Sequence, residues 1–305
     1  MADLKTIEKL VSESRNQATQ AIDEMSTLEM ARVMNEEDQK VALAVQACLP
    51  QIAEAVDLIA DALQKGGRLF YTGAGTSGRL GVLDASECPP TFGVSNELVQ
   101  GIIAGGFPAL VKSSESTEDS KEEGRKDCIE YGVRAGDVLV GLAASGRTPY
   151  AIAGLEYAKE VGARAIAVTC NPGSEMAQVA ELTIAPVVGP EVVTGSTRLK
   201  SGTAQKLVLN MLSTLTMVKL GKTYGNLMVD VQPTNAKLVE RAKKIIMEAA
   251  EVTYERAAEA LAASNGRVKV ATVIALTGAP AEQAVSALEQ GQGFVKKAVR
   301  LLRGE

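Results

Sequence analysis

Two short glycine-rich stretches carry hydroxyl side chains where a phosphate could bind. The stretch Gly73-Ala-Gly-Thr-Ser-Gly78 follows the apolar run Arg68–Thr72, and the stretch Ala144-Ser-Gly-Arg-Thr-Pro149 ends the apolar run Val138–Ala144. A strand that leads into such a turn and then into a helix presents free backbone N–H groups at the positive end of that helix. The pattern predicts an anion site. Its hydroxyl-bearing residues are Thr76, Ser77, Ser145 and Thr148.

The same hydroxyls have a simpler interpretation, because Ser and Thr cap the first turn of many helices. The first loop is not a nicotinamide-binding fingerprint, since no acidic residue ends the strand that follows Gly73-Ala-Gly75. It is not a Walker loop either, because that loop requires Gly-Lys followed by Ser or Thr. These exclusions favour a sugar phosphate over a nucleotide, and capping alone stays open as the alternative.

The absence of histidine restricts the chemistry that this chain can perform. It removes Ser–His and Cys–His dyads, histidine metal sites and imidazole acid–base catalysis, so proton transfer falls to Glu, Asp, Lys, Tyr or Cys. The cysteines lie far apart with no C-x-x-C pair, which predicts neither a zinc site nor a disulfide framework. We therefore expect no metal and no cofactor. The four cysteines are Cys48, Cys88, Cys128 and Cys170.

The composition is that of an ordinary soluble globular protein. The chain has 305 residues, of which 46% are apolar and 23% are charged. Its net charge of -5 and its lack of Trp argue against nucleic-acid binding, which needs basic patches or stacking platforms. No window approaches the ~20 apolar residues of a membrane span, and no apolar leader opens the chain. We expect a cytoplasmic protein that binds a small molecule.

The segments that must position these residues alternate between two patterns. Residues 4–65 show helical spacing, with a capping box at Ser26-Thr-Leu-Glu29 and a second helix start at Asn35-Glu-Glu-Asp38. Short apolar runs then alternate with amphipathic segments, which predicts a five-stranded parallel sheet with helices on both faces and ligands beyond the carboxyl ends of its strands. The runs are Arg68–Thr72, Leu98–Ala104, Val138–Ala144, Arg164–Thr169 and Leu182–Pro186.

The last third of the chain is expected to be helical. A long helix is predicted from Arg198 to Leu220, and three or four short ones after Asp230, with breaks near residues 264–266, 278–280 and 291. The predicted division is an N-terminal helical arm (residues 1–55), a phosphosugar-binding domain (56–225) and a small C-terminal helical domain (226–305).

Longer motifs make the sequence resemble a known family. The loops Gly-Thr-Ser-Gly and Ser-Gly-Arg-Thr resemble the sugar isomerase (SIS) domain. Nearly the whole chain is similar to the N-acetylmuramic acid 6-phosphate etherase family. The stretches that carry this resemblance are Leu83-Asp-Ala-Ser-Glu-Cys-Pro-Pro-Thr-Phe-Gly93, Glu118-Asp-Ser120, Gly141-Leu-Ala-Ala-Ser-Gly-Arg-Thr-Pro-Tyr150 and Thr194-Gly-Ser-Thr-Arg-Leu-Lys-Ser-Gly-Thr-Ala-Gln-Lys206.

The resemblance implies a carbon–oxygen lyase that releases D-lactate from the sugar phosphate, leaving N-acetylglucosamine 6-phosphate during peptidoglycan recycling. It implies that Glu118 is the base at carbon 2 and that Glu87 is the acid that protonates the leaving lactate. We expect burial beside apolar neighbours to hold Glu87 protonated. From the residues alone, Glu87 could equally be a helix-end carboxylate, and Glu118 could belong to a solvated acidic run.

The resemblance also implies a binding set and a homodimer. The C-terminal helices resemble a small ubiquitin-associated (UBA)-like bundle, which we interpret as a stabilising or dimerising appendage. Two alternatives stay open: a non-catalytic phosphosugar sensor of the glucokinase-regulatory type, and an aldose–ketose isomerase. The implied substrate-binding residues are Gly75, Thr76, Ser77, Gly78, Ser145, Gly146, Arg147, Thr148, Ser196 and Lys200.

Overall fold

The computed structural model describes residues 13–112, 115–233 and 235–305. The chain forms two compact units. One comprises the chain up to Ser86 together with Glu97–Ser213, and the other comprises Glu87–Asn96 together with Thr214–Glu305. The expected three-part division at residues 55 and 225 stays a prediction, and residues 1–12 of the expected arm lie outside the described residues.

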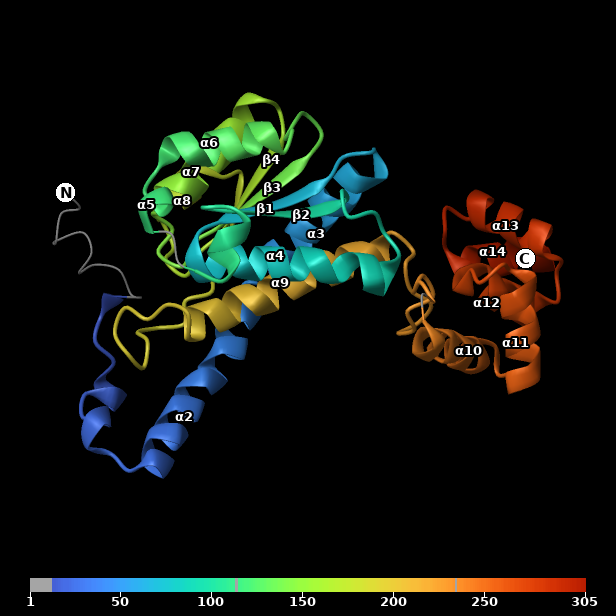
Figure 1. The fold of residues 1–305 in the computed structure, drawn as a ribbon, viewed down its shortest axis with the longest axis horizontal. Helices are drawn as coiled ribbons and strands as arrows, with labels where there is room; N and C mark the ends of the chain where they lie inside the picture. Colours follow the sequence, from blue (N-terminus) through green and yellow to red (C-terminus); the bar gives the residue numbers. More distant parts are fainter. Residues whose placement is uncertain (1–12, 113–114, 234) are drawn as a thin grey trace. The chain divides into compact units, whose positions relative to one another are not determined.

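The first unit is built around a five-stranded sheet (Figure 1). Its strands are β1 (Leu69–Gly73), β2 (Val99–Ile103), β3 (Val138–Leu142), β4 (Arg164–Val168) and β5 (Leu182–Ile184). Every neighbouring pair is parallel and the spatial order is β2-β1-β3-β4-β5. The parallel α/β fold predicted from the sequence is confirmed. Because the order reverses between β1 and β3, the ligand-binding crevice of such a sheet is expected at the carboxyl ends of these two strands.

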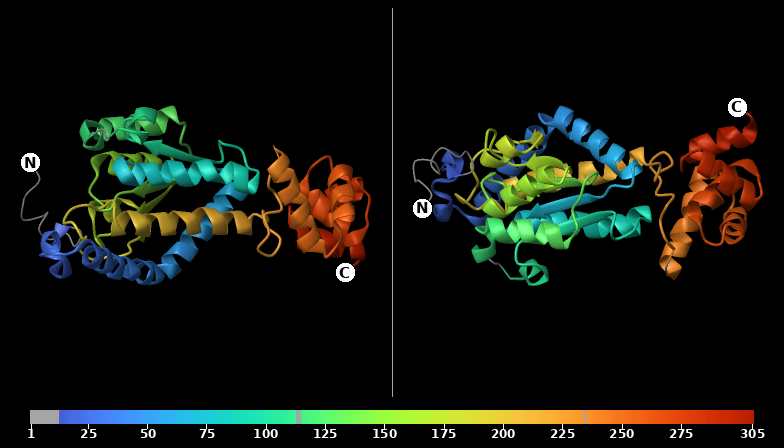
Figure 2. Two further views of the ribbon diagram at one scale, coloured as in Figure 1. Left: turned by 60° about the horizontal axis from the view of Figure 1, so that its bottom comes forward. Right: turned by 90° about the horizontal axis from the view of Figure 1, so that it is seen from above.

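Helices cover both faces of this sheet (Figures 1 and 2). Alternate residues of β1 point to opposite faces: Phe70 packs in a buried cluster with residues of α6, α7 and α8, whereas Tyr71 donates a hydrogen bond to Asp84 of α4 on the other face. The helices on the first face are α6 (Lys121–Glu130), α7 (Pro149–Glu160) and α8 (Glu175–Val179). Those on the second are α3 (Leu49–Gln64), α4 (Gly75–Phe92) and α9 (Lys200–Lys219).

The N-terminal part of the first unit is helical. Two 3-10 turns, η2 (Gln17–Thr19) and η3 (Ile22–Glu24), precede α2 (Thr27–Gln46). The capping box predicted at Ser26 is confirmed, with Glu29 as its reciprocal partner. The helix start predicted at Asn35 is wrong. Asn35 lies inside α2, where its Oδ1 accepts a hydrogen bond from Gln39 one turn later, so its capping potential is satisfied within the helix.

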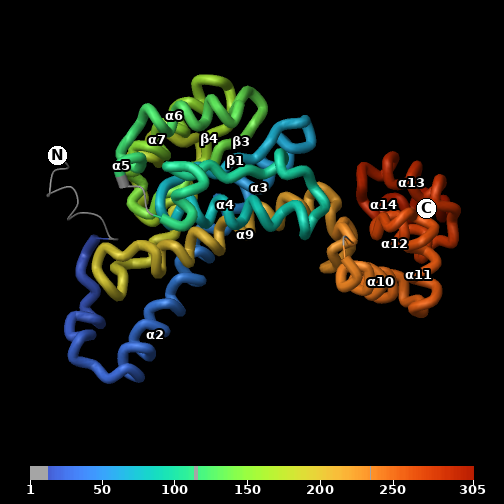
Figure 3. The backbone as a smooth tube through the Cα atoms, viewed as in Figure 1, coloured from blue at the N-terminus to red at the C-terminus, as the bar shows by residue number. Residues whose placement is uncertain are grey.

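A short break bends the path between α2 and α3 by 58° (Figure 3). In the described part of the chain no single helix is long and apolar enough to span a membrane, and only this bent pair meets the length and composition criterion together.

The second unit contains five helices among its described residues, one or two more than expected. The predicted breaks near Gly266, Gly278 and Gly291 fall between helices, but a further break lies at Glu251. Glu251 adopts a left-handed conformation (φ 54°), and Thr253 caps the next helix. Left-handed helix ends usually use Gly, so a Glu at this position does not predict a break. The helices are α10 (Ala236–Ala250), α11 (Tyr254–Ala263), α12 (Val268–Thr277), α13 (Ala281–Gln290) and α14 (Val295–Arg303).

Candidate active site

A cavity of about 270 Å³ lies at the carboxyl ends of β1 and β3, where the strand order reverses. The start of α4, the loop between β3 and α7, and the end of the short helix α5 (Glu115–Glu118) contribute to its wall. The cavity brings together both of the loops that the sequence singled out. Its lining residues are Glu13, Ala74, Gly75, Thr76, Ser77, Glu118, Ala143, Ala144, Ser145, Thr148 and Thr197.

The start of α4 faces this cavity because the helix packs directly on the sheet. A Cβ atom at Gly78 would lie 2.5 Å from the Gly73 carbonyl oxygen, so only glycine permits this approach. Thr76 and Ser77 lie within the first turn of α4 rather than at its cap. The backbone N–H groups of a first turn have no partner within their helix and are available to an anion.

The second loop places its hydroxyls by a turn at Gly146, where φ is +68°. Thr148 occupies the cap position of α7, but its side chain makes no capping hydrogen bond. Its Oγ1 instead donates to Oε1 of Glu118 across 3.2 Å. The Ser145 hydroxyl accepts a hydrogen bond from the Arg147 backbone N–H at 3.2 Å. Helix capping therefore does not explain these hydroxyls.

The two carboxyl groups implied for catalysis occupy different surroundings. Glu118 is half-buried and lines the cavity. Glu87 is exposed, which corrects the expectation that apolar neighbours bury it. It follows Ser77 by ten positions on α4, which is about 15 Å along a helix axis at ~1.5 Å per residue.

Lys200 also differs from its expected role in substrate binding. Its side chain is only 1% exposed, and its Nζ lies 2.6 Å from Oε2 of Glu37 on α2. Burial by itself would raise the pKa of Glu37, but hydrogen bonds from Lys200 and then Lys40 outweigh burial and lower that pKa to about 2. This pair ties the start of α9 to α2, and the ammonium group does not line the cavity.

Four other implied binding residues lie outside the lining. Arg147 forms an ion pair with Glu175, with Nε 3.1 Å from Oε1. The Ser196 backbone N–H donates to the carbonyl of Val193, and its neighbour Thr197 lines the cavity instead. The remaining two, Gly78 and Gly146, act through the close packing and the turn that they allow.

The positive end of α9 is already occupied by a carboxylate of this chain. Glu191 is fully buried and accepts hydrogen bonds of 2.9 Å from the backbone N–H groups of Lys200 and Ser201 and from the Ser201 hydroxyl. A carboxylate in this position offsets the partial positive charge of the helix end. The starts of α4 and α7 contribute residues to the cavity lining, whereas the N–H groups of Lys200 and Ser201 at the start of α9 are taken by Glu191.

Sequence reasoning missed several residues around the site. Glu13 and Thr197 line the cavity. Thr197 lies in a stretch that resembles the family, but nothing in the local pattern marked out either residue. Asp84 is a buried carboxyl that accepts hydrogen bonds from Tyr71 (2.9 Å), Asn210 (2.8 Å) and Ser213 (3.1 Å). Burial raises the pKa of Asp84. Its position inside a helix of mixed polarity gave no signal of this network.

The cavity offers neutral donors rather than cations. None of the described residues that line it is Lys or Arg, and two of them, Glu13 and Glu118, carry carboxyl groups. Over the residues that the structure describes, no cluster of His, Cys, Asp and Glu is arranged to hold a metal ion. The site can hold an anion through hydroxyls and backbone N–H groups, with a carboxyl group beside it to exchange a proton.

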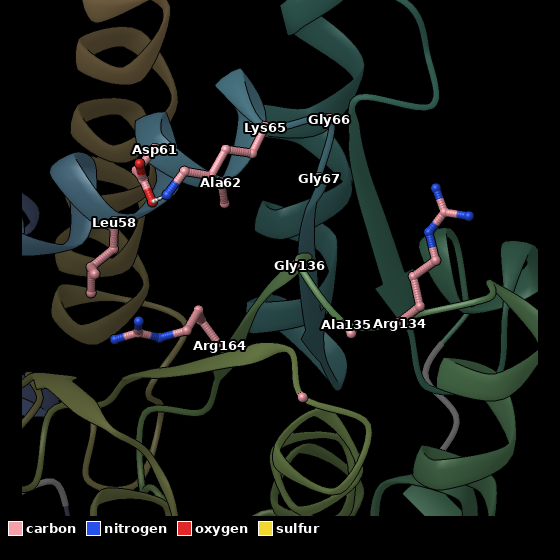
Figure 4. Close-up of a pocket in the computed structure, with 11 residues that line it drawn as sticks. Leu58, Asp61, Ala62, Lys65, Gly66, Gly67, Arg134, Ala135, Gly136 and Arg164 are labelled. Carbon is pink, nitrogen blue, oxygen red and sulfur yellow. Dashed lines mark hydrogen bonds and ion pairs between the residues drawn. The ribbon is translucent and has the colours of Figure 1, made fainter.

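A larger cavity of about 430 Å³ lies at the opposite edge of the sheet (Figure 4). Lys65 pairs there with Asp61, and Arg164 pairs with Glu181. Figure 4 shows Arg134 and Arg164 well apart, with their side chains pointing away from each other. These cations do not converge on one point, so this cavity has no comparable anion site.

Two family models match the first unit. The model of the glucokinase regulatory protein N-terminal SIS domain matches residues 51–159, and the model of the SIS domain matches residues 130–215. A solved phosphoheptose isomerase from Francisella tularensis is 16% identical and covers 64% of this chain and 100% of its own, with a TM-score of 0.46.

Curated proteins match nearly the whole chain. The N-acetylmuramic acid 6-phosphate etherase of Aliivibrio fischeri is 57% identical over 290 residues, which cover 95% of this chain and 97% of that protein. The protein of the same name from Clostridium beijerinckii is 56% identical over 294 residues, covering 96% of this chain and 97% of its own. That from Pasteurella multocida is 54% identical over 297 residues, covering 97% and 99%.

Proposed function

We propose, from the premise that this chain belongs to the N-acetylmuramic acid 6-phosphate etherase family, that it cleaves the D-lactyl ether of N-acetylmuramic acid 6-phosphate. The products are N-acetylglucosamine 6-phosphate and D-lactate. The observation that carries the proposal within the structure is the cavity in which the hydroxyls of both strand-end loops meet the carboxyl group of Glu118. No observation favours the non-catalytic sensor.

The phosphate is assigned to the start of α4 and the loop after β3. The free N–H groups of the first helical turn and the hydroxyls of Thr76, Ser77, Ser145 and Thr148 surround one small cavity. The Thr148 hydroxyl has one proton, which it donates to Glu118 in this structure. Binding of a phosphate to Thr148 would redirect that proton and release the Glu118 carboxylate for chemistry.

The reaction needs only two carboxyl groups and water. In the open-chain sugar the aldehyde acidifies the hydrogen on carbon 2, and Glu118 removes it as a proton. The electron pair forms a double bond between carbons 2 and 3, and the carbon 3–oxygen bond breaks as Glu87 protonates the departing lactate. Water then adds to carbon 3, giving its proton to the Glu87 carboxylate, while Glu118 returns a proton to carbon 2. This series of reaction steps, in which a carbon–oxygen bond breaks by elimination, is the basis for assigning the protein to the carbon–oxygen lyases.

The role of Glu87 connects to the proposed homodimer. Within one chain about 15 Å of α4 separates Glu87 from Ser77, which is longer than a single sugar ring can bridge. We therefore propose that Glu87 acts on substrate held by a second copy of the chain. Its exposure leaves it accessible to such a copy. Cytoplasmic location and the UBA-like nature of the C-terminal helices stay predictions.

Release of D-lactate from N-acetylmuramic acid 6-phosphate by the purified chain tests the activity. In deuterated water, Glu87→Ala is expected to block ether cleavage but still to exchange the carbon 2 hydrogen, whereas Glu118→Ala stops both. Equal exchange by the two variants would reverse or remove the assignment. Absence of lactate with phosphosugar binding intact would support the sensor instead.

Mixing the two inactive variants tests the second copy. If Glu87 acts across the dimer, mixed dimers contain one complete site and the mixture regains lactate release. No regain after verified subunit exchange would show that Glu87 does not act in this way.

A further inference from the structure

The hydroxyl of Ser77 is engaged in a buried hydrogen bond on the side away from the cavity. Its Oγ donates to Oε1 of Gln205 on α9 across 2.9 Å. Gln205 is only 1% exposed, and its Nε2 has no hydrogen-bond partner among the residues that the structure describes. A buried donor without a partner is unfavourable, because it has lost its hydrogen bonds to water.

This arrangement is poorly suited to an anion. A serine hydroxyl has one proton and two lone pairs. While the Ser77 proton points to Gln205, only lone pairs of Oγ remain for the cavity, and they repel the oxygens of a phosphate. This one contact therefore has two unfavourable features. The amide N–H of Gln205 has no acceptor, and the Ser77 hydroxyl has no proton left to donate to a phosphate.

Turning the Gln205 amide by half a rotation about its last side-chain bond gives Nε2 a partner and frees the Ser77 proton. Nε2 then takes the place of Oε1 and donates to Oγ of Ser77, which releases the hydroxyl proton toward the cavity. We propose that Gln205 is a positioning residue of the phosphate site, whose amide N–H sets the direction of the Ser77 hydroxyl when a phosphate-bearing ligand binds. The inference rests on the proposed function in taking this cavity as the phosphate site.

The surrounding structure holds the Gln205 side chain beside the Ser77 hydroxyl. The first turn of α9 is anchored by the buried carboxylate of Glu191, and α9 packs closely on the start of α4. A Cβ atom at Gly202 would lie 3.4 Å from the Thr76 side chain. These contacts hold the backbone on both sides of the contact between Ser77 and Gln205.

Two substitutions in the full-length chain separate this role from simple packing. Gln205→Met keeps the length of the side chain but neither donates nor accepts strongly. Gln205→Glu keeps the shape but only accepts, so it holds the Ser77 proton and places a negative charge beside the phosphate. The probe is inorganic phosphate, with its dissociation constant measured by calorimetry. The second readout is the separation of KM from kcat with the phosphosugar.

We expect Gln205→Met to raise the dissociation constant for phosphate about tenfold, the effect of losing one hydrogen bond to a charged group. Gln205→Glu should weaken binding further, and both should raise KM much more than they lower kcat. In a Ser77→Ala background, Gln205→Met should add less than about a twofold change, because the hydroxyl on which it acts is gone.

The outcomes distinguish this inference from the proposed function. If Ser77→Ala weakens phosphate binding but both Gln205 variants bind as the wild type does, Gln205 has no positioning role and the phosphate site stands. If Ser77→Ala leaves phosphate binding unchanged, the assignment of the phosphate to this cavity fails. Should Gln205→Met fail to fold, Gln205→Glu decides alone, and phosphate binding as tight as in the wild type overturns the inference.

Discussion

At the amino end of the sheet a cavity of about 430 Å³ is lined by Lys65, Arg134 and Arg164, whereas the cavity of about 270 Å³ at the carboxyl end contains no Lys or Arg among its described lining residues. A count of cations would therefore place the anion at the amino end. The direction of the helices instead favours an anion at the carboxyl end of the sheet. In a parallel sheet flanked by helices, helix ends with exposed carbonyls gather at the amino edge, and helix starts with free N–H groups gather at the carboxyl edge.

Two of the three cations at the amino end of the sheet already have carboxylate partners within the chain. Lys65 follows the last turn of α3 and pairs with Asp61, and Arg164 pairs with Glu181. Positive side chains near helix carbonyl ends are stabilising in themselves. At the carboxyl ends of the strands, hydroxyl and backbone N–H donors converge on a cavity. The buried charged groups lie behind the residues that line it. We therefore base the proposed anion site on the convergence of donors rather than on cavity volume or on the number of cations.

The largest expected effect is on the buried ion pair between Lys200 and Glu37. Replacing Lys200 by Met removes the buried partner of the Glu37 carboxylate and leaves Lys40 as its remaining cationic partner, so we expect the free energy of unfolding to fall by about 3 kcal/mol, the lower end of the range for a broken buried pair. The matched change at the amino edge is Lys65→Met. It removes an exposed ion pair with Asp61 and should lower the free energy of unfolding by less than about 1 kcal/mol. Urea unfolding measures both.

The pair also predicts the pH dependence of stability. The pKa of Glu37 is lowered to about 2 in the folded chain from its ordinary value of 4.5. Its contribution is therefore complete above about pH 4.5 and is lost as the pH falls toward 2. In the variant Lys200→Met this part of the acid transition should be smaller, because Lys200 is the first of the partners that lower the pKa of Glu37 and Lys40 remains. Equal losses in Lys200→Met and Lys65→Met would contradict the distinction between the two edges.

A smaller effect is expected on substrate binding. Ser145→Ala removes one hydroxyl from the phosphate site, and we expect KM for the phosphosugar to rise about tenfold with kcat little changed, because a remote binding group is lost. Arg134→Ala at the amino edge should leave both constants unchanged. Steady-state kinetics of the two variants make the comparison. A rise in KM for Arg134→Ala alone would move the anion site to the larger cavity.

The sequence predicts this fold well where the signal is local. Five apolar runs became the five strands, and the two hydroxyl-bearing loops meet at one cavity, because parallel strands bring their carboxyl ends to one edge. The prediction of a second helix start at Asn35 was wrong, because Asn caps helices but is also tolerated inside a long amphipathic helix. The end of α10 at Glu251 was missed because it lacks the usual glycine.

The partners of individual side chains could not be read from the sequence. Lys200 is 163 positions from Glu37, and Ser77 is 128 positions from Gln205. Such contacts depend on how α2, α4 and α9 pack, and no local periodicity encodes that packing. The same limit applies to Glu87. Its place in a motif indicated chemistry, but the helix on which it lies determines its distance from the phosphate loop.

The smallest expected effect concerns Asp84, which lies behind the cavity wall without lining it. Burial raises the pKa of Asp84 in the folded chain above the ordinary 3.8. Between these two values the folded chain binds more protons than the unfolded one, so this group lowers the free energy of unfolding as the pH rises through that window. Asp84→Asn removes this titration. The amide keeps one of the two acceptor oxygens that Tyr71, Asn210 and Ser213 share, so we expect the loss of one hydrogen bond, worth about 1 kcal/mol.

The variant should therefore be less stable than the wild type at pH 4, and the deficit should shrink as the pH rises to 7. Urea unfolding at the two pH values measures this change. A deficit that grows with pH would mean that the three donors favour the ionised carboxylate more than burial opposes it. In that case Asp84 would be a carboxylate stabilised by its hydrogen-bond partners, like Glu37 and Glu191, near the carboxyl ends of the strands. The three carboxylates would then share one role, which is to fix the helices whose starts face the cavity.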